Sequence, residues 1–357
     1  MTAEKVVRAG LIGCGDISSS HLKTYAACGI ELAALCDKDI ERAEARREEF
    51  GTPETPVFDD HRKLLEVPDL DFVTVATPVA AHVPITLDAL RAGLHVACEK
   101  PSALSIAENE AVVREAEKSD RKVIFFSSRM RWGMMTLARE YAQEGMLGDI
   151  YRVDVTYYRR RGRPGLDVIP EAHWFLDSTQ AGGGVVMDMG QYFMDAVLDL
   201  TGWPQITAAS ATTFRGHGHE LPEEVPFDVE EHCTFLARAA GGLSFTFDLA
   251  WVAHNHPTRR ITILGTEGGI LMDGDQPFTF FHDKGGPWRW MNTTTDWKDS
   301  VRGNEHAYTD FVRALRGETV DVGTTPEQAL AITELTQMVL CSAHEGREMT
   351  LEELRQT

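Results

Sequence analysis

Short apolar runs alternate with charged, amphipathic stretches over the first part of the chain, and this alternation limits the possible folds more than any other feature of the sequence. An apolar run of strand length followed by a stretch with helical periodicity is typical of a strand and the helix that crosses back over its sheet. Repetition of that unit predicts a parallel sheet with helices on both faces. Strands are expected at residues 6–12, 31–36, 71–76, 95–98 and 122–127, and helices at 20–29, 39–50, 82–92 and 106–119.

The pattern changes after about residue 128. One more helix is expected at residues 134–144, then an extended run at 150–159 and a helix that ends at residue 200. Extended runs follow at 208–214, 231–237, 243–250 and 260–263 before a last helix at 326–343. Strands with few helices between them predict a large, mostly antiparallel sheet. We therefore expect an α/β protein with a Rossmann dinucleotide-binding domain at 1–127 and an α+β domain at 128–357, whose last helix is able to pack back on the first domain.

The charge balance limits the classes of partner. The chain carries 55 Asp and Glu against 35 Lys and Arg, a net charge of −20. Such a surface repels phosphate backbones and anionic membranes, so we expect no nucleic-acid and no membrane partner. No run approaches the roughly 18 apolar residues of a membrane span, and no apolar segment precedes the first strand as in a signal peptide.

The cysteine and histidine spacing argues against a disulfide framework and a metal site. The six cysteines are scattered and form no C-x-x-C pair, which favours reduced thiols in a cytoplasmic protein. His254 and His256 have a spacing that metal ligands can have, but no acidic or cysteine cluster stands near them in the sequence. We expect no metal.

A glycine-containing turn follows the first expected strand. Gly13-x-Gly15-x-x-Ser18 has the spacing of a dinucleotide fingerprint, with Ser18 where Gly or Ala is usual. Gly13 permits a tight turn, and Gly15 lets the backbone approach a pyrophosphate at the start of the next helix. Asp37 ends the second strand, where a carboxylate accepts hydrogen bonds from ribose hydroxyls and repels a 2′-phosphate. These features predict NAD, and the neighbouring Lys38 leaves NADP open as an alternative.

Several longer segments resemble one oxidoreductase family. VTVATPVAAHVPITLDALRAGLHVACEKP and AGGGVVMDMGQYFMD resemble the two motifs of the glucose-fructose oxidoreductase, inositol dehydrogenase and rhizopine catabolism (Gfo/Idh/MocA) family. WVAHNHPTRRITILGTEGGILMD and TPEQALAITELTQMVLCSAHEG also resemble that family, so the likeness covers nearly the whole chain. It implies a nicotinamide cofactor, a sugar or polyol substrate bound between the domains, and a homodimer or homotetramer formed through the C-terminal sheet.

The resemblance also implies which residues act. Lys100 matches the lysine that reaches the reacting oxygen in the family, and an ammonium there can hold a hydroxyl and stabilise negative charge. Asp188 matches the substrate-binding acid, and Tyr192 stands where His is commonest, as in the glucose-fructose oxidoreductase and dihydrodiol dehydrogenase branches. Positions four apart on a helix share a face, so Asp188 and Tyr192 can address one substrate. We predict Lys100, Asp188 and Tyr192 as the catalytic set.

The predicted cofactor-binding residues are Gly13, Gly15, Asp16, Ile17, Asp37, Thr77, Pro78, His82, Glu99 and Lys100. Three further residues are weaker substrate candidates. His173 and Trp174 could stack on and hydrogen-bond to a sugar, or could be a core Trp beside a surface His. Arg161, in a run of arginines, could grip an anionic group, or could belong to a solvated loop.

Three functions fit these residues. The first is an NAD(P)-dependent dehydrogenase or reductase acting on a sugar or polyol CH–OH group. The second is a glycosidase that oxidises its sugar transiently with retained NAD. The third is a nucleotide-sensing regulator without catalysis, which the presence of Lys100, Asp188 and Tyr192 disfavours.

Overall fold

The structure is a computed structural model that describes residues 6–131, 133–218, 221–274, 278–283, 289–293 (backbone alone) and 304–356. The chain divides into two compact units. The first contains the residues up to Arg129 and a later segment that ends at Leu330, and the second contains the remainder. The chain therefore returns to the first unit after leaving it, and the predicted single boundary after residue 127 does not include this later segment.

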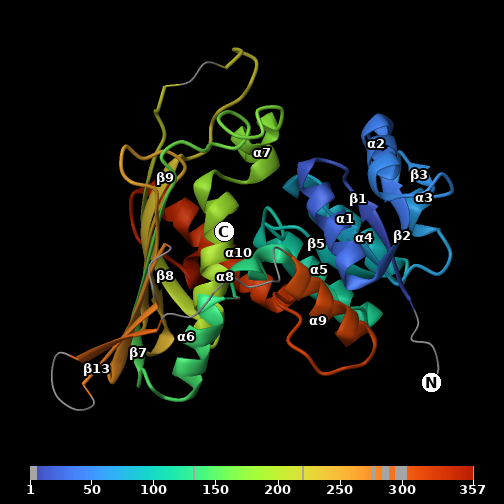
Figure 1. The fold of residues 1–357 in the computed structure, drawn as a ribbon. Helices are drawn as coiled ribbons and strands as arrows, with labels where there is room; N and C mark the ends of the chain where they lie inside the picture. Colours follow the sequence, from blue (N-terminus) through green and yellow to red (C-terminus); the bar gives the residue numbers. More distant parts are fainter. Residues whose placement is uncertain are drawn as a thin grey trace. The chain divides into compact units, whose positions relative to one another are not determined.

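The first unit is built on a parallel sheet of six strands (Figure 1). Its order is β3-β2-β1-β4-β5-β6, and each neighbouring pair is parallel. The order reverses between β1 and β4, which is where doubly wound folds bind ligands at the carboxyl ends of their strands. The strands are β1 (Val7–Ile12), β2 (Ile30–Cys36), β3 (Val57–Phe58), β4 (Phe72–Val75), β5 (His95–Cys98) and β6 (Val123–Phe125).

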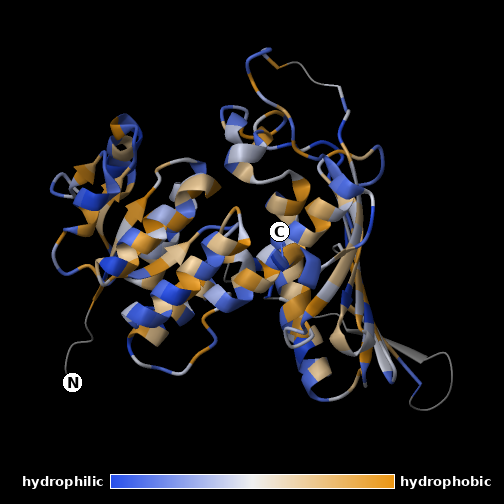
Figure 2. Cartoon of the chain, turned by 180° about the vertical axis from the view of Figure 1, so that it is seen from behind, coloured by the Kyte–Doolittle hydropathy of each residue, from blue (hydrophilic) through white to orange (hydrophobic). Residues whose placement is uncertain are grey.

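Helices cover both faces of this sheet, whose strands are rich in apolar residues (Figure 2) and are buried on both sides. Neighbouring strand residues such as Leu11 and Ile12 belong to opposite core clusters. One cluster includes residues of α1 and α9, and the other includes residues of α4 and α5. The helices are α1 (Asp16–Cys28), α2 (Ile40–Phe50), α3 (His61–Leu65), α4 (His82–Arg91), α5 (Ile106–Ser119) and α9 (Glu305–Leu315). The predicted Rossmann fold is confirmed.

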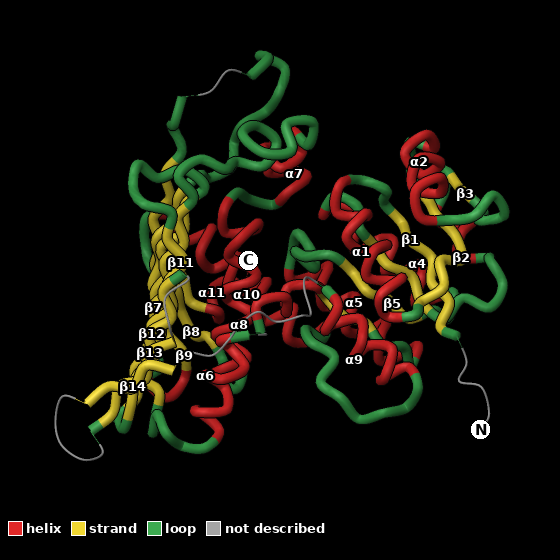
Figure 3. Tube along the Cα trace, viewed as in Figure 1, coloured by secondary structure: helices red, strands yellow, loops and turns green. Residues whose placement is uncertain are grey.

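The second unit contains a sheet of nine strands, drawn in yellow in Figure 3. Its order is β14-β13-β12-β11-β7-β10-β9-β8-β15, and among these pairs only β7 and β10 run parallel. The strands are β7 (Ile150–Tyr158), β8 (Ile206–Phe214), β9 (His232–Ala239), β10 (Ser244–Ala250), β11 (Thr258–Gly265), β12 (Gly268–Asp273), β13 (Phe278–His282), β14 (Arg289–Thr293) and β15 (Met349–Thr350). The predicted, mostly antiparallel sheet is confirmed.

Alternate residues of β9, β10 and β11 are buried, so this part of the sheet has one apolar, packed face. Phe245, Phe247 and Leu249 of β10 are buried, whereas the residues between them are partly exposed. The other helices of the chain are α6 (Met134–Gln143), α7 (Ser178–Ala181), α8 (Gln191–Leu200), α10 (Pro326–Glu345) and α11 (Leu351–Gln356). Among the described residues, no helix combines the length and apolar character that crossing a membrane requires.

Candidate functional site

The turn after β1 leaves room for a ligand at the start of α1. Gly13 has φ +98°, and a Cβ there would lie 2.5 Å from the carbonyl carbon and oxygen of Ala76, so only glycine fits. Gly15 caps α1, and a Cβ at Gly15 would meet no atom within 4 Å. The helix start thus faces open space, which suits a pyrophosphate. Asp16 is exposed and Ile17 half-buried in the first turn of α1.

Ser18, the departure from the usual fingerprint, is buried, and its hydroxyl donates to the carbonyl oxygen of Gly15. Arg46 of α2 donates from Nε to the same hydroxyl at 2.8 Å and from its guanidinium to Gly15 O at 3.3 Å. Ser18 therefore ties the turn to α2. The sequence reasoning did not identify Arg46, because nothing along the chain links it to the turn.

Asp37 is fixed by two backbone hydrogen bonds. One carboxylate oxygen accepts from the N–H of Cys14 at 2.7 Å, and the other accepts from the N–H of Asp39 at 2.9 Å. The side chain is half-buried, and Lys38 beside it is exposed. Each carboxylate oxygen keeps a further lone pair for a ligand hydroxyl. This donor set fits the ribose end of a dinucleotide.

The residues after β4 lie at the same carboxyl edge. The Thr77 hydroxyl is buried and has no hydrogen-bond partner among the described residues, as expected for a group that awaits a ligand. Pro78 is exposed. His82 is fully buried, and its ring nitrogens lie 2.7 Å from the carbonyl oxygen of Pro101 and 2.8 Å from that of Thr77. The His82 ring therefore ties two loops of this edge together.

Glu99 and Lys100 follow β5. The Glu99 carboxylate is buried; one oxygen lies 3.0 Å from Nε2 of His21, and the other accepts from the backbone N–H of Lys100 at 3.1 Å. Burial alone would raise the pKa of Glu99, but the hydrogen bond and the electrostatic attraction of His21, followed by those of Lys100, outweigh it and lower that pKa below its ordinary value. Glu99 is therefore negatively charged and is hydrogen-bonded to the backbone of Lys100, whose side chain is half-buried.

In the second unit, the glycine cluster allows close approach of the segment at Glu230. A Cβ on Gly184 would lie 1.8 Å from the carbonyl oxygen of Glu230. The buried Glu230 carboxylate accepts from the N–H groups of Gly184 at 2.8 Å and Val186 at 3.0 Å. This cap begins the helix that carries Asp188 and Tyr192. The turn Val186–Gly190 is π-helical, a local irregularity that is common at functional sites.

Two residues that follow strands of the nine-stranded sheet contact the Asp188 carboxylate. The indole N–H of the buried Trp251 donates to its carboxylate at 2.9 Å, and the Arg159 guanidinium lies 3.7 Å from the same oxygen. Tyr192 is half-buried on α8. The sequence reasoning named neither Trp251 nor Arg159 as a partner of Asp188, because both are distant from it along the chain.

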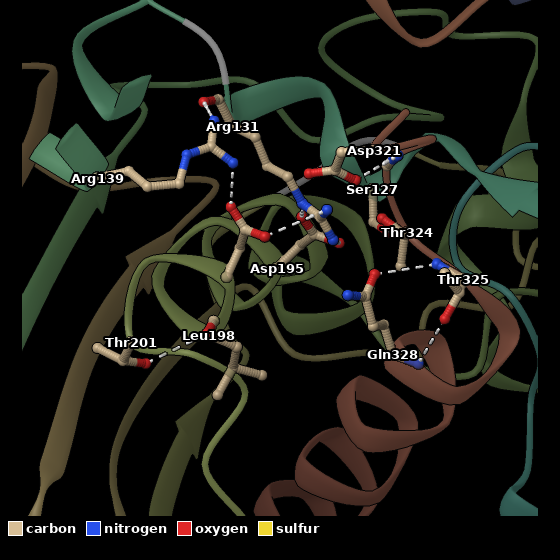
Figure 4. A network of polar contacts seen from close by, with 12 residues as sticks. Ser127, Arg131, Arg139, Asp195, Leu198, Thr201, Asp321, Thr324, Thr325 and Gln328 are labelled. Carbon is tan, nitrogen blue, oxygen red and sulfur yellow. Dashed lines mark hydrogen bonds and ion pairs between the residues drawn. The ribbon is translucent and has the colours of Figure 1, made fainter. Parts of the chain in front are cut away.

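A buried ion pair anchors α8 (Figure 4). The guanidinium of Arg131 donates to the two carboxylate oxygens of Asp195 at 2.6 and 3.2 Å, and both side chains are almost fully buried. Asp199 pairs with Arg131 at 3.3 Å and with Arg139 at 2.8 Å. Since Asp195 follows Tyr192 by one turn, this cluster fixes the segment that presents Tyr192.

The weaker substrate candidates are placed as follows. His173 and Trp174 lie in a short 3-10 turn and are half-buried, and the Trp174 ring stacks on Phe175 with centroids 3.8 Å apart. Arg161 is mostly exposed and pairs with Asp167 at 2.8 Å. Among the described residues, no group of three or more His, Cys, Asp or Glu side chains could hold a metal ion.

The doubly wound sheet with its glycine turn, open helix start and acid after β2 defines a dinucleotide-binding protein. The comparisons with known proteins agree. A family model described as "Oxidoreductase family, NAD-binding Rossmann fold" matches residues 7–126, and one described as "GFO/IDH/MocA C-terminal domain" matches residues 135–271. The chain belongs to the Gfo/Idh/MocA oxidoreductase family, which confirms the resemblance, and it carries that family's NAD-binding domain.

The curated relatives include sugar dehydrogenases and glycosyl hydrolases. D-glucoside 3-dehydrogenase of Escherichia coli is 32% identical over 215 residues, which span 59% of this chain and 59% of the relative. D-apiose dehydrogenase of Paraburkholderia graminis is 26% identical over 99% of this chain and 92% of the relative. Among solved structures, levoglucosan dehydrogenase in complex with NADH and levoglucosan superposes with a TM-score of 0.83 at 21% identity, covering 97% of this chain and 100% of that one. This last likeness establishes the fold.

Proposed function

We propose that this chain is an NAD-dependent dehydrogenase that oxidises a hydroxyl group of a sugar or polyol. The observation that carries the proposal is the carboxyl edge of the parallel sheet. Gly13 and Asp37 directly follow β1 and β2, and Lys100 is the second residue after β5 of the same sheet, so the glycine turn and a lysine lie on the same edge. The curated relatives support a sugar as the substrate class.

We further propose a division of labour between residues 1–127, which bind the nucleotide, and residues 128–357, which bind the substrate. NAD, when bound, supplies the acceptor for a hydride. The free N–H groups at the start of α1 bind the pyrophosphate, and Gly15 leaves the room for it. Asp37 accepts from the ribose hydroxyls and repels a 2′-phosphate, which favours NAD over NADP. The remaining predicted cofactor residues, Asp16, Ile17, Thr77, Pro78, His82 and Glu99, surround or support this edge.

Lys100 is assigned to the reacting hydroxyl. Its ammonium donates a hydrogen bond to that oxygen and stabilises the negative charge that develops as the hydride leaves carbon. The buried Glu99 carboxylate attracts this ammonium. Tyr192 is assigned to the proton of the same hydroxyl.

Asp188 is assigned to binding a substrate hydroxyl. Trp251 and Arg159 both face one of its oxygens, and this fixes the direction of the carboxylate. The proposed mechanism assigns Lys100 and Tyr192 to the same substrate hydroxyl. A Lys100→Met/Tyr192→Phe double variant should therefore lose no more activity than the worse single variant, because residues that act as a unit are not additive.

The decisive experiment is a screen of NAD and NADP reduction against sugars, polyols and glycosides, with Lys100→Met as the variant. We expect net NADH formation with a sugar or polyol, and a loss of turnover of about 100- to 10,000-fold in the variant with little change in nucleotide affinity. Glycoside cleavage without net NADH would instead identify the glycosidase. Nucleotide binding with neither reaction would identify the regulator.

We also propose a cytoplasmic homodimer or homotetramer that associates through the partly exposed face of the nine-stranded sheet. Phe281 of β13 is 42% exposed and lines a hollow of about 500 Å³ over β11 and β12. Exposed apolar groups on a sheet are typical of protein contacts. Light scattering of wild type and a Phe281→Asp variant tests this, since the substitution should lower the mass of the assembly.

A further inference from the structure

A chain of hydrogen bonds crosses the core of the first unit and ends at the residue before Lys100. The distances between successive side chains are 2.6, 2.8, 2.9 and 3.0 Å. Each of these side chains is buried. They come from α1, β4, α9 and the end of β5, and their order is Tyr25, Thr74, Tyr308, His21 and Glu99.

The direction of the chain follows from the chemistry of its members. The amide nitrogen of Asn304 lies 3.4 Å from Nδ1 of His21 and can only donate, so Nδ1 is an acceptor. The hydrogen of His21 is then on Nε2, from which it is donated to the Glu99 carboxylate. With this tautomer each hydroxyl has an acceptor: Tyr25 donates to Thr74, Thr74 donates to the Tyr308 oxygen, and Tyr308 donates to His21. All donors therefore point toward Glu99.

The two oxygens of Glu99 have separate tasks. Oε1 faces Nε2 of His21, whereas Oε2 accepts from the backbone N–H of Lys100. The carboxylate thus fixes the backbone from which the Lys100 side chain departs. It also places a negative charge near the Lys100 ammonium.

We propose that His21 and Tyr308 are positioning residues for Lys100. They hold Glu99 as an oriented carboxylate, and Glu99 in turn fixes the backbone of Lys100 and places a negative charge near its ammonium. This inference rests on the proposed function of Lys100.

A change in titration is the expected sign of this role. The titratable groups that face Glu99 are His21 of α1, Tyr308 of α9, His82 of α4, Cys98 of β5 and Lys100, and Tyr25 faces Tyr308. If the His21 N–H is removed, burial becomes the dominant effect on Glu99 and its pKa rises. Below that raised pKa, Lys100 loses its anionic neighbour. The acid limb of activity therefore moves to higher pH, by about one to two pH units for the loss of one hydrogen bond to a charged group.

The test is a pH titration of the Glu99 carboxyl carbon by NMR in the nucleotide-free full-length protein, with the signal assigned by a Glu99→Gln variant. His21→Leu removes the hydrogen bonds of His21 to Glu99, Tyr308 and Asn304 and should raise the Glu99 pKa by about one to two units. His21→Gln keeps one donor and one acceptor and should restore most of the wild-type value. An unchanged Glu99 titration in His21→Leu would overturn the inference.

Comparison of Tyr308→Phe with its matched control Tyr25→Phe tests the positioning role even if the His21→Leu variant does not fold. Each removes one buried hydroxyl, but only Tyr308 contacts His21. We expect Tyr308→Phe to raise the Glu99 pKa and the acid limb of kcat/KM by about half a unit, and Tyr25→Phe to leave both unchanged at a similar cost in Tm. Equal effects of the two variants would show that these hydrogen bonds contribute to packing only and do not position Lys100.

The same measurements separate this inference from the proposed function. If the Glu99 titration responds as expected but Lys100→Met keeps full turnover, the catalytic role of Lys100 fails, and the positioning role fails with it. If Lys100→Met abolishes turnover while Glu99 titrates identically in every variant, the proposed function stands and only this inference fails.

Discussion

Loss of the Asp195 charge should destabilise the second unit strongly. The Asp195 carboxylate accepts two hydrogen bonds from Arg131, and the exposed fractions of the two side chains are 0% and 1%. An Asp195→Asn variant leaves a buried guanidinium without this anion. Breaking such a pair costs about 3–5 kcal/mol. Because Asp199 stays 3.3 Å from Arg131, we expect the lower end of that range, about 3 kcal/mol.

The measurement is thermal and urea unfolding of the full-length chain. For a unit of this size, a loss of about 3 kcal/mol lowers Tm by roughly 6–12 °C. Arg347→Ala is the control, because its pair with Glu353 is about half exposed and should contribute less than about 1 kcal/mol. We also expect kcat to fall, since α8 carries Tyr192, while NAD affinity is retained.

A double variant provides the refutation. Arg131→Met/Asp195→Leu removes both charges, so it should recover most of the stability that Asp195→Asn loses. If Asp195→Asn is as stable as wild type, the pair does not anchor α8. If the double variant is less stable than the single one, packing of the two side chains, and not the unpaired charge, sets the loss.

Three further predictions concern single residues. Tyr192→Phe should lower turnover strongly with little change in Tm or NAD affinity. Tyr192→His should recover part of the activity at a lower pH optimum, because imidazole titrates below phenol. Full activity of the Tyr192→Phe variant at every pH would show that Tyr192 transfers no proton. Asp37→Ser should raise NADP affinity relative to NAD in fluorescence titrations, and tighter NADP binding by wild type would contradict the assignment. Burial would raise the pKa of Asp167, but hydrogen bonds from Arg163 and Arg161 lower it to about 2. Because the pKa of Asp167 is lower in the folded than in the unfolded chain, its ionisation stabilises the fold by about 2 kcal/mol above about pH 4, and this stabilisation is lost as the pH falls toward about 2. Asp167→Asn should therefore be less stable than wild type at about pH 7, and its Tm should depend less on pH in the acid range.

Local sequence determined the first sheet and its nucleotide turn. The alternation of strand and helix patterns predicted five of the six strands of the parallel sheet, and only the two-residue β3 was not expected. The places of Gly13 and Gly15 after β1 and of Asp37 after β2 could be predicted, because the local sequence encodes where these strands end. The helices at residues 82–92 and 106–119 followed from their periodicity for the same reason.

Tertiary structure alone decided which distant residues support these positions. α9 returns to the first sheet from beyond residue 300, and its Tyr308 reaches His21 of α1. Trp251 reaches Asp188 from the end of β10, and Glu230 caps the turn at Gly184. No local pattern specifies such partners, because a buried polar group takes whichever group the packing of distant segments brings within hydrogen-bond distance. The sequence places the reactive groups at the ends of their strands and helices, whereas burial in the folded core determines their partners and their charge.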